Sequence, residues 1–213
     1  KTGKSLDIVR RYCDFVPAWA EKSDHIEMYN YYGISRAQHQ VTIPVWNRMQ
    51  ADFQDYVRLG LEGVSSEGVA DCAGLWTGGD DKRDELFPYH SWTMNGLLFW
   101  LYSKLAWNPW EDVDALIATY CDRYYGAASA DMQEYYRLMK QGWDEGTPSY
   151  KQSVFFYTHY TEYYKKFIKP AKIGHPVLDA LDRAIAVTSG RVREEIQYIR
   201  DTFYTNISSF QNW

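Results

Sequence analysis

The order of helical and strand patterns constrains the fold of this chain more than any other feature. A helical pattern covers residues 5–22, a strand pattern 25–32, a second helical pattern 43–59 and a second strand pattern 61–66. This alternation predicts two parallel strands joined by a crossover helix. From residue 86 onward we find only helical patterns. The sequence therefore predicts an α/β fold with a large α part.

The segment Gly63–Val69 is the most informative of these patterns. It predicts a short buried strand that ends in a single carboxylate, Glu67. Enzymes of the (β/α)₈ barrel type place their reactive groups at the carboxyl ends of such strands, so Glu67 is the candidate catalytic residue. The alternative is a structural carboxylate that accepts hydrogen bonds from the amides of its own loop.

Aromatic residues suggest where a substrate would lie. The chain has 19 Tyr and 9 Trp, and such rings either stack on sugar rings or pack helices together. His90 either exchanges a proton, since the unperturbed pKa of His is near 6.5, or caps the helix that follows. The candidate substrate-binding residues flank the predicted strand ends: Asn30, Tyr31, Tyr32, Trp76, His90 and Trp92.

The segment 70–88 is rich in Gly and Asp and predicts a long loop, which is either functional or simply a surface loop. Asp80 and Asp81 do not have the spacing of an EF-hand loop, so we interpret them as solvated acids. After it, Asn108-Pro109-Trp110-Glu111 predicts the start of a new helix, with Asn108 as the cap and Pro109 in the first turn.

Charge and cysteine content exclude several classes of protein. The net charge is −5 and no basic run is present, so nucleic acid is not expected as a partner. No apolar run has the length needed to cross a bilayer. Cys13, Cys72 and Cys121 lack Cys-x-x-Cys spacing, which argues against a disulfide framework and a zinc site. No cofactor and no metal are predicted.

Several short motifs, in the same order along residues 5–140, resemble one bacterial family. They are Tyr31-Tyr32, Gly63–Gly68, Leu105-Ala106-Trp107-Asn108-Pro109, Asp112-Val113-Asp114 and Tyr124-Tyr125-Gly126-Ala127-Ala128. The family is the glycoside-hydrolase-like group known as domain of unknown function 4838, found among polysaccharide-degrading genes. It is distantly similar to the α-glucuronidases and β-hexosaminidases.

The resemblance implies a (β/α)₈ (TIM-type) barrel followed by a helical bundle. It also implies an oligo- or polysaccharide partner and a secreted or periplasmic location. The α-glucuronidases carry a catalytic carboxylate on the strand where this chain has Asn30-Tyr31-Tyr32.

The length of the chain limits how much barrel it can hold. A complete barrel takes about 250 residues, and the chain has 213. We therefore expect residues 1–107 to be the last strand–helix units of a barrel and residues 108–213 to be a C-terminal helical domain. A missing N-terminal barrel segment would then complete the sheet. The sequence favours glycoside hydrolysis, and the alternative is a non-catalytic carbohydrate-binding or helical interaction module.

Overall fold

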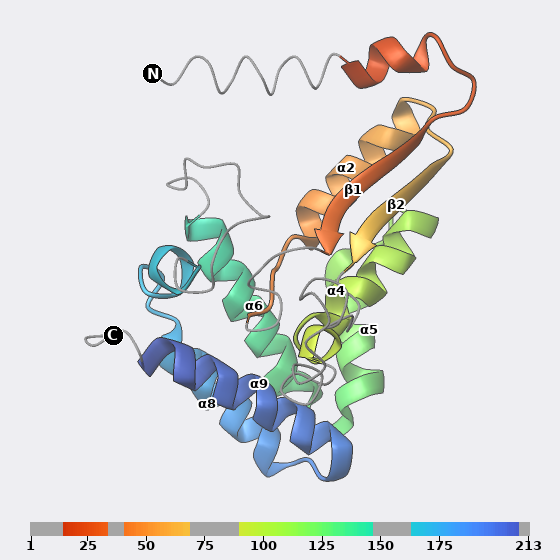
Figure 1. Ribbon diagram of the computed structural model, residues 1–213. Helices are drawn as coiled ribbons and strands as arrows, with labels where there is room; N and C mark the ends of the chain where they lie inside the picture. Colours follow the sequence, from red (N-terminus) through yellow and green to blue (C-terminus); the bar gives the residue numbers. More distant parts are fainter. Residues whose placement is uncertain (1–14, 34–40, 69–89, 147–162, 209–213) are drawn as a thin grey trace, which may run out of the picture.

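The computed structural model describes residues 15–33, 41–68, 90–146 and 163–208, which form a mostly helical structure with two strands (Figure 1). Residues 15–20 are helical. The further elements, in chain order, are β1 (Glu27–Gly33), α2 (Trp46–Arg58), β2 (Gly63–Gly68), α4 (His90–Trp107), α5 (Val113–Tyr125), the 3-10 turn η1 (Gly126–Ala128), α6 (Ser129–Gly146), the π-helical turn η3 (Tyr164–Ile168), α8 (Gly174–Ala186) and α9 (Gly190–Ser208).

The two strands and the helix between them form a parallel β–α–β unit. β1 pairs with β2 in parallel, with Glu27 opposite Gly63 and Asn30 opposite Ser66. Helix α2 lies along one face of the pair in Figure 1. The predicted parallel strands with a crossover helix are therefore confirmed, although each strand is shifted by one or two residues from its predicted range.

Helix α2 packs through one apolar stripe. Its buried residues Trp46, Met49 and Phe53 follow helical spacing, so they face the same side. The chain turns after the helix at Gly60, whose φ is +79°. Glycine is favoured there because it adopts this left-handed conformation without a steric cost. This turn delivers the chain directly to β2.

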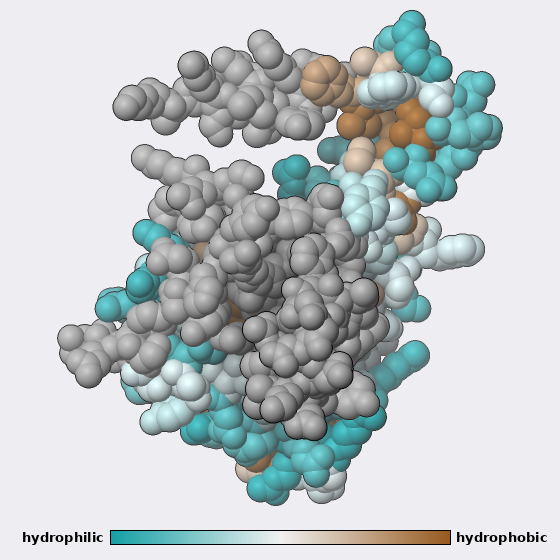
Figure 2. Space-filling view, viewed as in Figure 1, coloured by the Kyte–Doolittle hydropathy of each residue, from teal (hydrophilic) through white to brown (hydrophobic). Residues whose placement is uncertain are grey.

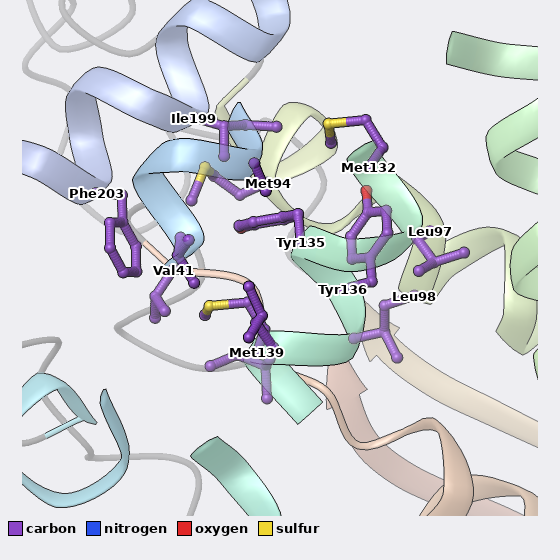
Figure 3. Close-up of a cluster of buried hydrophobic side chains, with 14 of the residues drawn as sticks. Val41, Met94, Leu97, Leu98, Met132, Tyr135, Tyr136, Met139, Ile199 and Phe203 are labelled. Atoms are coloured by element: carbon purple, nitrogen blue, oxygen red, sulfur yellow. The ribbon is translucent and has the colours of Figure 1, made fainter. Parts of the chain in front are cut away.

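The segment before α2 lies in the centre of the core. All residues from Val41 to Trp46 are buried. Figure 3 shows Val41 among side chains of α4, α6 and α9, including Met94, Met139 and Phe203. Residues from both sides of the predicted boundary at 107/108 therefore share one hydrophobic core. The division into two domains stays a prediction.

A kink in α4 satisfies the polar backbone of this buried segment. Asn95 has non-helical dihedral angles (φ −129°, ψ 17°) and is 1% exposed. Its Oδ1 accepts a hydrogen bond from the Ile43 amide at 3.3 Å, and the carbonyl of Met94 accepts one from Thr42 Oγ1 at 2.7 Å. Buried backbone groups need such partners, which explains why a polar residue lies among the buried Met94, Leu97 and Leu98 of this helix.

The remaining helices pack around α6. Helix α6 contacts α5, α8 and η3, and α8 packs against α9. The α8–α9 pair lies at the bottom of Figure 1, with the two helices side by side. The large α part predicted from the sequence is therefore confirmed.

The start of α5 differs from the prediction. The helix begins at Val113, and Asp112 is its cap, because its Oδ1 accepts a hydrogen bond from the Ala115 amide at 3.0 Å. Asn108 instead closes a separate turn, in which its Oδ1 accepts from the Trp110 amide at 3.2 Å. The predicted cap was wrong because both Asn108 and Asp112 are good capping residues.

Exposed apolar side chains gather at one end of the described structure. Figure 2 shows hydrophilic residues over much of the described surface and hydrophobic ones near the top, where Figure 1 places the 15–20 helix. Phe15 and Trp19 of this helix are 53% and 66% exposed, and Val57 of α2 is 48% exposed. Figure 1 shows that β1 begins near this end.

Candidate functional site

The carboxyl ends of β1 and β2 lie beside each other. Asn30 pairs with Ser66, and Gly33 pairs with Gly68, with an irregularity between the two pairs. The Tyr32 amide donates a hydrogen bond to Ser66 Oγ at 3.1 Å. The fold thus brings the backbone of Glu67 next to the end of β1, which is the juxtaposition that the sequence predicts for parallel strands.

Two of the candidate substrate-binding side chains face helix α2. Asn30 Nδ2 donates to the Tyr56 hydroxyl at 3.0 Å, and the Tyr32 hydroxyl donates to Asp52 Oδ2 at 2.6 Å. Residues i and i+2 of a strand share one face, so this pair is the helix-facing side of the β1 end. Their contact with a substrate stays a prediction.

Asp52 is the polar centre of this cluster. Its Oδ1 forms an ion pair with Arg48 Nε at 2.9 Å, and its side chain is only 15% exposed. Burial raises the pKa of Tyr32, and the hydrogen bond and charge of Asp52 raise it further. Burial and the same charge also raise the pKa of Tyr56. Both phenols therefore stay neutral: Tyr32 donates to Asp52, and Tyr56 accepts from Asn30.

Sequence reasoning did not identify Asp52. One signal was available, because Arg48 and Asp52 have the i, i+4 spacing of a helical ion pair and Asp52 lies directly before the buried Phe53. Charge pairs of this kind are common on exposed helix faces, so the spacing alone does not show that one partner is largely buried.

Tyr102 of α4 packs against the same cluster. Its ring packs edge-on against Phe53, with centroids 5.3 Å apart, and lies 6.5 Å from the ring of Tyr32. Its hydroxyl is buried and has no hydrogen-bond partner among the described residues. Burial and the nearby Tyr56 raise the pKa of Tyr102, so this hydroxyl is a neutral group that can still donate or accept one hydrogen bond.

The other face of the strand pair is open in the described part of the chain. Glu27 and Ser65 are exposed, and Tyr29 is 54% exposed. Parallel sheets are ordinarily covered on both faces. The two strands also form the whole of the described sheet, so each has an edge without a partner among the described residues.

The remaining candidates are placed only in part. Glu67 and Tyr31 lie in β2 and β1, and His90 and Trp92 lie in the first turn of α4, but their side chains fall outside the described residues. Trp76, Asp80 and Asp81 lie outside the described residues altogether. The catalytic role of Glu67 and the binding roles of the others remain predictions.

The described ranges give two further results that concern function. They contain no group of three or more His, Cys, Asp or Glu side chains arranged to hold a metal ion. Within the same ranges, no helix combines the length and the apolar character of a membrane span. Neither result identifies a reaction.

Comparison with known proteins places the chain in a family. No curated protein and no solved structure matches the chain. A family model matches residues 2–137, a range that includes β1, α2, β2, α4 and α5. This match covers well over half of the chain, and the chain belongs to the family described as Domain of unknown function (DUF4838).

Proposed function

We propose that this chain is part of a carbohydrate-active protein of the glycoside-hydrolase-like type, with Glu67 as one of its reacting carboxylates. The observation that carries the proposal is the adjacency of the β1 and β2 carboxyl ends, which brings Glu67 beside the Asn30–Tyr32 segment. Sheets of parallel strands bind ligands beyond their carboxyl ends. The motifs that resemble glycoside-hydrolase-like proteins support the choice of a sugar as ligand.

Glycoside hydrolysis defines what Glu67 would do. One carboxylic acid protonates the leaving oxygen, and a second carboxylate acts as nucleophile or activates water. The carboxyl groups are about 5–5.5 Å apart in retaining enzymes and about 6.5–9.5 Å apart in inverting ones. We assign one of these roles to Glu67 and assign its partner to another strand of the same sheet.

A larger barrel would supply that strand. The β1–α2–β2 unit is the repeating unit of a (β/α)₈ barrel. The exposed Tyr29 and Ser65 lie on the face that such a barrel would turn inward, opposite the face covered by α2. The unpaired edges of the described strands support further strands on either side, because open edges are ordinarily covered or paired.

Replacing Glu67 with Gln in the full-length protein tests the catalytic role. Turnover on a panel of oligo- and polysaccharides should fall by about 10²-fold or more, since a Gln can neither donate a proton as an acid nor accept one. The matched control is Glu62→Gln. Glu62 is exposed and directly precedes the amino end of the same strand. Equal turnover in Glu67→Gln and Glu62→Gln would exclude Glu67 from the chemistry.

A further inference from the structure

The turn between α4 and α5 presents two tryptophan side chains to solvent. Trp107, the last residue of α4, is 91% exposed, and Trp110 is 55% exposed. Tryptophan is highly buried on average in folded proteins. Trp107 has the largest exposed fraction among the large hydrophobic side chains of the described residues. Two such side chains within four residues therefore call for a functional explanation.

Helix α2 holds this turn in place. Gln50 Nε2 donates to the carbonyls of Pro109 and Glu111 at 3.0 and 2.7 Å, and Gln54 Nε2 donates to the Pro109 carbonyl at 2.9 Å. Pro109 itself is buried. The backbone between the two indoles is thus fixed while the indoles remain outside the core. Fixing a binding element before the ligand arrives lowers the entropy cost of binding.

The surroundings of the indoles limit what can bind there. The neighbouring exposed residues are Ala106, which is small, and the polar Lys104, Asn108 and Asp112. Two tryptophans together offer at most about 500 Å² of contact area, whereas a stable protein interface needs about 800 Å² from each partner. The two indoles alone do not supply the area of an interface with a folded protein or a second copy of this chain. Only one cation lies among these neighbours, so a polyphosphate backbone is not favoured either.

We propose that Trp107 and Trp110 form an oligosaccharide-binding surface. The C–H groups on one face of a sugar ring carry a small positive charge, which matches the negative face of an indole. Three residues of chain span at most about 11 Å, so a short oligosaccharide reaches both rings. The Asn108 amide and the Asp112 carboxylate lie in or next to the same turn and provide polar groups for sugar hydroxyls.

This surface does not include the strand-end residues. Trp107 is the last residue of α4, five residues after Tyr102, whose ring lies 6.5 Å from that of Tyr32 at the end of β1. The inference rests on the carbohydrate activity proposed above, but it does not depend on Glu67. It assigns the turn to holding a glycan chain, and the strand ends to reacting with it.

A double Trp107→Ala/Trp110→Ala variant of the full-length protein tests the surface. Affinities for cellohexaose, xylohexaose and chitohexaose are measured by calorimetry and compared with those of Trp19→Ala, which removes an exposed Trp from a different element. The double variant should bind the preferred hexaose at least about tenfold more weakly, and Trp19→Ala should bind it like the wild type. Equal affinity of the double variant and the wild type, or no binding of any hexaose by the wild type, would overturn the inference.

Two further variants separate this inference from the catalytic proposal. Gln50→Ala keeps both indoles but loosens the turn, so it should also weaken binding, by a smaller factor. Glu67→Gln should lose turnover while the turn still binds the hexaose. If Glu67→Gln loses turnover but the double tryptophan variant keeps full affinity, only the binding surface is excluded. If Glu67→Gln keeps turnover but the double tryptophan variant loses affinity, only the catalytic role of Glu67 is excluded.

Discussion

The hydroxyl of Tyr32 donates a 2.6 Å hydrogen bond to Asp52, and this contact ties the carboxyl end of β1 to helix α2. The acceptor is a carboxylate that is 15% exposed and also pairs with Arg48. Bonds to charged acceptors are shorter and stronger than neutral ones. The position of the strand end, and with it the segment beside Glu67, therefore depends on a helix residue that contributes nothing to the sheet itself.

Tyr32→Phe should lower the free energy of unfolding by about 1.5–3 kcal/mol, the range for a hydrogen bond to a charged group. Asp52→Asn should also destabilise the chain, because it removes the charge that Arg48 pairs with. In the double variant the two effects should not add, with a coupling of about 0.5–3 kcal/mol for residues in direct contact. Urea unfolding measures all three values. Strict additivity would mean that the contact contributes nothing to stability.

Asn95→Leu should destabilise the chain by about 1–3 kcal/mol. The variant leaves the buried Ile43 amide without its acceptor, and an unsatisfied buried donor carries a cost of that size. Asn47→Leu is the control, since Asn47 is exposed on α2 and should change stability by no more than about 0.5 kcal/mol. Comparable losses in both variants would show that the kink at Asn95 has no special role.

The β–α–β unit and the helical part could be predicted from the sequence, because both depend on local periodicity. The stripe Trp46, Met49 and Phe53 and the break at Gly60 predict α2 and its end. Two consecutive strand patterns around such a helix leave few topologies other than a parallel pair.

The buried segment Val41–Trp46 and the Asp52 cluster could not be predicted in this way. Their structure depends on contacts with side chains far away in sequence. Tyr135 hydrogen-bonds Thr42, and the ring of Tyr102 packs against Phe53. No periodicity within one element encodes such contacts. The same limit applies to Trp107, because no local pattern in the sequence indicates that it is 91% exposed.

Gly146→Ala should destabilise the chain by about 1–3 kcal/mol, although alanine is the better helix former. An added Cβ would lie 2.6 Å from the Lys166 carbonyl oxygen and 2.5 Å from Phe167 Cδ1, and a backbone oxygen cannot rotate away. At Gly96 the nearest atom is instead the Tyr120 hydroxyl at 2.8 Å. Adding Tyr120→Phe should therefore restore stability to Gly96→Ala, whereas Phe167→Leu should not fully restore it to Gly146→Ala. Thermal unfolding distinguishes the two cases.

Alkaline pH should unfold the chain cooperatively. Burial raises the pKa of Tyr125, Tyr136, Tyr163 and Tyr164 well above the ordinary value, which is about 10 in an unfolded chain. A group whose pKa is raised by folding contributes stability that is fully present below the unfolded pKa and is lost as pH rises toward the folded pKa. Stability should therefore start to fall near about pH 10. Tyrosinate absorbance from these residues should appear together with the loss of helical circular dichroism.

A Tyr125→Phe/Tyr136→Phe double variant tests the cause of that transition. The two hydroxyls hydrogen-bond each other at 2.8 Å, so removing both leaves neither of them unsatisfied, but Tyr120 loses its hydrogen bond to Tyr125. The variant should therefore be less stable than the wild type at pH 7 by about 1 kcal/mol. Its stability should fall less steeply above about pH 10, since two buried groups that release protons on unfolding are gone. An unchanged pH dependence of stability, or tyrosinate absorbance that rises before the helices unfold, would show that these buried phenols do not drive the transition.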